Sequence, residues 1–115
     1  GEVREWCAGA LAALYTEMGG ESLYFGKPHP PIYDLARRRL TALDNAPSDP
    51  RIIAIGDGIG TDVLGGVQED LDVLFISGGL AAAETKTDHQ PDPDALAAYL
   101  QDAQMSATST IGHLR

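Results

Sequence analysis

The chain has little positive charge, and this shortage limits the partners that it can bind. Eight lysine and arginine residues stand against seventeen aspartate and glutamate residues, which gives a formal net charge of −9. A nucleic-acid groove and an anionic membrane surface both need a basic face, so we expect neither as a partner. A small local group of basic residues can still bind a phosphate, so phosphate chemistry stays open.

Cysteine and long apolar runs are also scarce. The single cysteine, Cys7, cannot form an internal disulfide and favours a reducing, cytoplasmic compartment. It lies beside Trp6 in an apparent helix, so we expect a buried structural thiol rather than a nucleophile. No apolar run reaches about 18 residues, the length that marks a membrane span. The chain starts without Met or a signal-peptide pattern, as though cut from something longer.

Alternating helical and extended patterns predict one α/β domain within the 115 residues. Such alternation favours a three-layer, Rossmann-like parallel sheet with right-handed crossovers and helices on both faces. The expected helices cover residues 6–17, 31–40, 61–69 and 94–104, and the expected strands cover residues 22–25, 52–55 and 72–77.

An apolar run that ends in a carboxylate loop is the most informative segment. Residues 52–55 are rich in isoleucine without polar alternation, which predicts a buried parallel strand. Asp57 follows directly after Gly56, where an α/β sheet places its ligands. A buried lone carboxylate is costly, and a hard cation held by oxygen ligands would compensate its charge. We expect Asp57 to bind a metal; the alternative is that it only caps the next helix.

Asp62 and Lys27 are the other candidates for a site at this edge. Asp62 is placed either to cap the following helix or to orient a metal-bound water or Lys27. Lys27 lies on a stiff turn before Pro28, where its ammonium could contact a phosphate oxygen as a point charge. The carboxyl ends of parallel strands meet at one rim, so we expect Lys27 and Asp57 to be neighbours. The alternative is an exposed loop lysine without a function.

Other patterns in the chain are weaker. His29, close to Lys27, is either a substrate contact or an ordinary turn histidine. The three histidines show no metal-ligand spacing, and Ser77 lacks the context of a nucleophile elbow. The glycines from residue 56 onward spell neither the dinucleotide fingerprint nor the nucleotide P-loop, so a nucleotide-cofactor domain is the weaker interpretation.

The two loops together resemble the C-terminal part of a haloacid dehalogenase superfamily phosphatase, of the class that includes NagD and the p-nitrophenylphosphatases. Residues 23–33, with Gly26-Lys27-Pro28, resemble its third motif, and residues 55–62 resemble its fourth, G-D-x-x-x-T-D. The resemblance covers about residues 6 to 100. It implies that Lys27 contacts the phosphoryl group and a nucleophilic Asp, that Asp57 binds Mg²⁺, and that Asp62 supports the metal.

The chain departs from this family at the nucleophile. No Asp-x-Asp precedes Lys27, and Asp92-Pro93-Asp94 has the letters without a strand leading into it. We therefore expect residues 1–20 to be the end of a cap or linker helix, 21–105 to be the C-terminal half of the hydrolase core, and 106–115 to be a tail.

The expected function follows from this partial resemblance. The full-length parent would be a Mg²⁺-dependent phosphatase that acts on a small phosphorylated substrate, such as a sugar phosphate or nucleotide, through an aspartyl-phosphate. The isolated chain would be inactive. The alternative is a non-catalytic α/β module that binds a ligand or a protein partner. A truncated sheet would leave an unpaired edge, so we also expect a homodimer.

Overall fold

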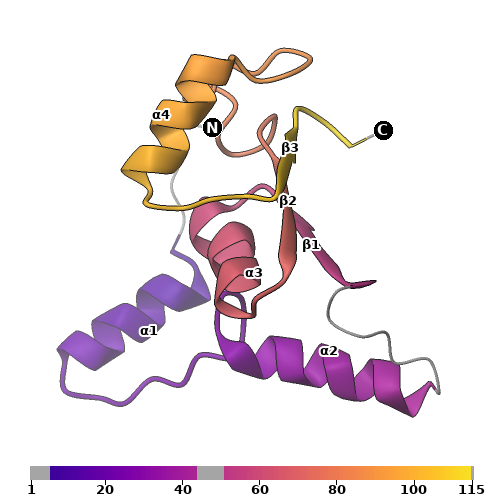
Figure 1. Ribbon diagram of the computed structural model, residues 1–115. Helices are drawn as coiled ribbons and strands as arrows, with labels where there is room; N and C mark the ends of the chain where they lie inside the picture. Colours follow the sequence, from indigo (N-terminus) through magenta and orange to yellow (C-terminus); the bar gives the residue numbers. More distant parts are fainter. Residues whose placement is uncertain (1–5, 44–50, 115) are drawn as a thin grey trace.

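The computed structural model describes residues 6–43 and 51–114. The described elements are α1 (Ala8–Glu17), α2 (Pro30–Ala42), β1 (Ile53–Gly56), the π-helical turn η2 (Ile59–Val63), α3 (Leu64–Gln68), β2 (Asp72–Ile76), α4 (Pro93–Asp102) and β3 (Ser109–Ile111). The strands form one parallel sheet in the order β1-β2-β3 (Figure 1). The predicted parallel α/β fold is therefore confirmed.

One face of the sheet carries the hydrophobic core. Val73 and Phe75 of β2 are buried against Val63 of η2, and Leu96 and Leu100 of α4 pack on this cluster as their spacing predicts. α3 and α4 lie on the same side of the strands (Figure 1). The periodicity of α4 is thus explained by its contact with the sheet.

The opposite face of the sheet is open in the described part of the chain. Ile53 and Ile55 of β1 point away from the core-facing Ala54, and each is 49% exposed. A helical layer over this second face is not among the described residues. The arrangement is therefore a partial core, with one packed face and one apolar face in contact with solvent.

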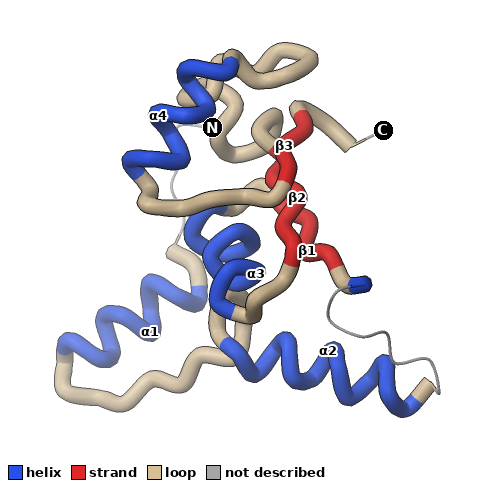
Figure 2. The backbone as a smooth tube through the Cα atoms, viewed as in Figure 1, coloured by secondary structure: helices blue, strands red, loops and turns tan. Residues whose placement is uncertain are grey.

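The prediction of a strand at residues 22–25 is wrong. This segment is a loop between α1 and α2 (Figure 2), and Leu23 and Phe25 are 72% and 65% exposed. The segment makes no ladder with the sheet, and a strand is stable only with a partner. The third strand is β3 instead, which comes from the residues expected to form a tail and pairs with β2.

The prediction of a buried Cys7 is also wrong. The thiol is exposed and stands at the N-terminal end of α1, a helix with no buried residue. The backbone N–H groups of Ala10 and Gly9 lower the pKa of the Cys7 thiol. No helix among residues 6–43 and 51–114 is long and apolar enough to cross a membrane.

Candidate functional site

Lys27 and Asp62 form an ion pair between the loop before α2 and the η2 turn. The Lys27 ammonium donates to Oδ1 of Asp62, and the backbone N–H of Gly58 donates to Oδ2 at 3.0 Å. The Asp62 side chain is only 10% exposed, whereas that of Lys27 is 54% exposed. Both oxygens of this buried carboxylate have donors, which is what a buried charge requires.

Of the two alternatives for Asp62, capping of the next helix is not what the structure shows. The helical segment starts earlier, with Gly58 as the N-cap of η2, and no side chain caps it. Asp62 lies inside the turn, and its carboxylate reaches back to the Gly58 amide. Gly56 makes room for this geometry, because a Cβ there would lie 2.2 Å from the Asp62 carboxyl carbon.

The groups around Lys27 raise its pKa. The hydrogen bond to Asp62 is the main cause that raises this pKa, and the charge of Asp62 adds to it, while burial acts in the opposite direction. Smaller upward contributions come from Tyr33 and from Asp57. No hydrogen bond or ion pair between Lys27 and Asp57 is found among the described residues, so their position as neighbours at one rim stays a prediction.

Asp57 is held by the turn that follows the neighbouring strand. Its Oδ2 accepts a hydrogen bond from the backbone N–H of Leu80 at 3.1 Å. A Cβ on Gly79 would lie 2.2 Å from the same oxygen, so any side chain at position 79 would displace the carboxylate. The ends of β1 and β2 thus meet around Asp57, and the Gly78-Gly79 turn leaves the space that it occupies.

A cavity of about 360 Å³ opens beside Asp57. It is lined by the ends of β1 and β2 and by the segment after β3: Ile55, Gly56, Asp57, Ile76, Gly78, Gly79, His113 and Leu114. His113 was not predicted as a site residue. One signal could have found it, because Ile111-Gly112-His113 repeats the pattern of Ile55-Gly56-Asp57, a strand end followed by glycine and a polar residue.

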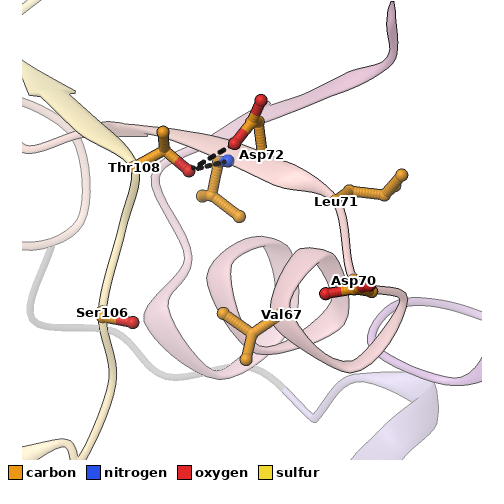
Figure 3. Close-up of a pocket in the computed structure, with 7 residues that line it drawn as sticks. Val67, Asp70, Leu71, Asp72, Ser106 and Thr108 are labelled. Carbon is orange, nitrogen blue, oxygen red and sulfur yellow. Dashed lines mark hydrogen bonds between the residues drawn. The ribbon is translucent and has the colours of Figure 1, made fainter. Parts of the chain in front are cut away.

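A larger cavity of about 450 Å³ lies at the other end of the strands, where β2 begins. Its polar residues include Asp70, Asp72, Ser106 and Thr108 (Figure 3). Thr108 donates to Asp72 at 3.1 Å and accepts from the Val73 amide at 3.0 Å. We place the candidate site at the Asp57 cavity despite its smaller size, because ligands of open α/β sheets bind beyond the carboxyl ends of the strands.

The remaining sequence candidates are accounted for by local contacts. His29 is exposed at the N-cap of α2, and its ring lies against Tyr24 with the centroids 5.2 Å apart. A substrate contact by His29 stays a prediction. Asp92, the first acid of the late Asp-Pro-Asp sequence, caps α4 by accepting from the Ala95 amide at 2.9 Å.

At this rim, one residue, Asp57, has a carboxylate that could bind a magnesium ion. Mg²⁺ is commonly bound through one or two carboxylates, substrate phosphates and several waters. Asp57 supplies carboxylate oxygen at the cavity, whereas both oxygens of Asp62 are engaged by Lys27 and Gly58. Across residues 6–43 and 51–114, no three His, Cys, Asp or Glu side chains gather as a metal cluster.

The fold and this rim define a partial Rossmann-like core, a parallel α/β sheet with charged residues beyond its strand ends. A family model described as HAD-hydrolase-like matches residues 24–103, and the chain therefore belongs to that family. The match includes Lys27, Asp57 and Asp62, and it confirms the family predicted from the two motifs. No curated protein matches the chain.

Solved structures of the same superfamily resemble the chain. A haloacid dehalogenase-like hydrolase from Brucella suis is 38% identical with a TM-score of 0.68, covering 96% of this chain and 38% of its own. A double-mutant thermostable NPPase from Geobacillus stearothermophilus is 31% identical with a TM-score of 0.53, covering 72% of this chain and 31% of its own. These likenesses support the predicted NagD-like phosphatase class.

A third structure shows the fold alone. A possible sugar phosphatase of the HAD superfamily from Cytophaga hutchinsonii is 19% identical with a TM-score of 0.62, and the comparison covers 90% of this chain and 32% of that one. The chain thus spans less than two fifths of the length of each of these three structures.

Proposed function

We propose that this chain is part of a cytoplasmic, Mg²⁺-dependent phosphatase that hydrolyses small phosphate monoesters, such as a sugar phosphate or a nucleotide, through an aspartyl-phosphate. The observation that carries the proposal is the Lys27–Asp62 ion pair, which lies on the loop that carries Asp57 just after the carboxyl end of β1. The membership in the HAD-hydrolase-like family supports it. Two of the similar structures are named a possible sugar phosphatase and an NPPase.

Lys27 would bind the phosphoryl group. Its pKa is raised, mainly by the hydrogen bond to Asp62, so the side chain keeps its positive charge throughout the neutral range. An ammonium that is half exposed but fixed by a buried carboxylate can meet an incoming phosphate without losing its orientation. In this proposal, Asp62 acts by positioning Lys27 and so supports the metal only indirectly.

Asp57 would be the protein ligand for Mg²⁺ within this chain. The bound ion would neutralise charge that develops on the phosphoryl oxygens. The Leu80 amide fixes the orientation of the carboxylate, and the cavity beside it gives access to solvent and substrate.

The nucleophile of the proposed reaction is not in this chain. No Asp-x-Asp precedes Lys27, and Asp92 of the late Asp-Pro-Asp sequence caps α4. We therefore propose that the 115-residue chain by itself does not turn over substrate.

An activity assay tests this proposal. The full-length protein should hydrolyse p-nitrophenyl phosphate with Mg²⁺, and Asp57→Asn should abolish turnover. Asp94→Asn, an exposed acid in the first turn of α4, is the matched control and should leave turnover unchanged. The proposal fails if the full-length protein is inactive, or if Asp57→Asn keeps full activity. Turnover by the isolated chain would show that the nucleophile has been misjudged.

The second candidate is a non-catalytic module that binds a phosphorylated ligand or a protein. The open apolar face with Ile53 and Ile55 half exposed favours it, because exposed apolar patches often mark interaction surfaces. Binding of inorganic phosphate near Lys27 by a full-length protein that hydrolyses no monoester would support this candidate over the phosphatase.

A further inference from the structure

Tyr33 of α2 lies where this helix meets α3, next to the ion pair. A Cβ on Gly65 of α3 would lie 2.0 Å from the Tyr33 hydroxyl oxygen and 3.2 Å from the Cα of Pro28. The same glycine therefore contacts both the Tyr33 ring and the residue that follows Lys27. Gly65 allows an approach of the two helices that a side chain would prevent.

A second contact repeats this one a helical turn further on. Arg37, four residues after Tyr33, forms an ion pair with Glu69, four residues after Gly65. Residues four apart lie on the same face of a helix, so the two contacts fix one face of α2 against α3. α2 has no fully buried residue, so its position depends strongly on these contacts.

Tyr33 also acts electrostatically on both members of the ion pair. Burial is the main cause that raises the pKa of the Tyr33 phenol, and the charge of Asp62 raises it further, while Lys27 lowers it. Tyr33 in turn contributes to the raised pKa of Lys27. The phenol thus stands within electrostatic range of both charges.

We propose that Tyr33 is a positioning residue for Lys27: its ring, seated on Gly65, holds the Gly26-Lys27-Pro28 turn against η2, so that the ammonium keeps its pairing with Asp62. The consequence for phosphate binding rests on the proposed function. The effect on Lys27 itself does not, because the ion pair is a property of this chain.

Nuclear magnetic resonance of the lysine side chains tests the positioning directly. The chain has two lysines, Lys27 and Lys86, so the two signals are easily assigned with a Lys86→Arg variant. We expect Tyr33→Ala to move the Lys27 Nζ signal and pKa toward those of a free lysine. Tyr33→Phe should keep both near the wild-type values, because the ring remains. Leu35→Ala on the same helix, at a residue 41% exposed, is the matched control.

Substitutions of Gly65 and Tyr33, alone and together, distinguish positioning of Lys27 by Tyr33 from a general loss of stability. Gly65→Ala should shift the Lys27 signal when Tyr33 is present and add little in the Tyr33→Ala background, because the hydroxyl oxygen that the new Cβ would meet is gone. An unchanged Lys27 signal in Tyr33→Ala, or fully additive effects of the two substitutions, would overturn the proposal.

Kinetics of the full-length protein extend the test to function. Tyr33→Ala should raise KM for p-nitrophenyl phosphate and the inhibition constant of inorganic phosphate, each on the order of tenfold, with a smaller effect on kcat. Wild-type KM in that variant would overturn the functional part. An inactive wild-type protein would refute the phosphatase, while the lysine signals would still decide whether Tyr33 positions Lys27.

Discussion

The Lys27–Asp62 pair should be measurable as a coupling energy in the stability of the chain. Replacing Lys27 by Met keeps most of the aliphatic stem but leaves the Asp62 carboxylate, 10% exposed, with the Gly58 amide as its described donor. Removing one partner of a buried pair costs about 3–5 kcal/mol. Because the Lys27 side chain is 54% exposed, water compensates part of this loss, and we expect about 2 kcal/mol.

Asp62→Asn should cost less, about 1 kcal/mol, because an amide oxygen still accepts from Gly58 and the lysine is left in solvent. In the double variant, Asp62→Asn has already removed the charge that Lys27→Met would leave unpaired. The two losses of unfolding free energy should therefore not add, and we expect a coupling free energy of about 1.5 kcal/mol. Urea unfolding followed by far-ultraviolet circular dichroism measures this. Fluorescence of Trp6 is a poor probe, since that residue is 79% exposed.

The pH dependence of the cycle gives an independent check. The folded-state pKa of Lys27 is raised above 10.5, so the stability from the pair is complete below pH 10.5 and is lost as the pH rises through the higher folded value. The difference between wild type and Lys27→Met should therefore shrink at strongly alkaline pH. Single-variant losses that add to within about 0.5 kcal/mol at neutral pH would refute the coupling.

Three further predictions concern the site, the thiol and the sheet edge. Gly79→Ala should displace the Asp57 carboxylate and lower the Mg²⁺-dependent activity of the full-length protein at least tenfold (about 1.4 kcal/mol). Gly60→Ala, at a position with open space around it, is the control, and equal activities of the two variants would contradict the prediction. Cys7 should react with a disulfide reagent without denaturant, and protection of the thiol would show that α1 is covered. Light scattering should detect a dimer of the chain, because the free edge of β1 is unpaired among the described strands, and a stable monomer would count against it.

The parts of the fold that depend on neighbouring residues in the sequence could be predicted. β1 is a short apolar run that ends at Gly56, and β2 is one that ends two residues before Gly78. The rule for strand ends placed Asp57 at the rim without knowledge of the rest of the chain. α4 followed from the spacing of Leu96 and Leu100 for the same reason.

The errors came from features that depend on distant partners. Residues 22–25 have strand-like composition, but no described strand pairs with them, whereas residues 109–111 find β2 as a partner. Cys7 has the sequence of a buried thiol, yet α1 buries no residue. The local pattern Ile111-Gly112-His113 marks a strand end, but it does not tell which strand lies beside it, and His113 lines the Asp57 cavity because β3 pairs with β2.

The proximity of a metal at Asp57 to the Lys27 ammonium is the central claim. It is tested most directly by adding Mn²⁺ to the full-length protein with isotope-labelled lysine and following paramagnetic broadening of the Lys27 signal. We expect strong broadening in the wild type that Mg²⁺ reverses and that Asp57→Asn removes. Binding of Mn²⁺ that leaves the Lys27 signal sharp, or broadening that persists in Asp57→Asn, would contradict it.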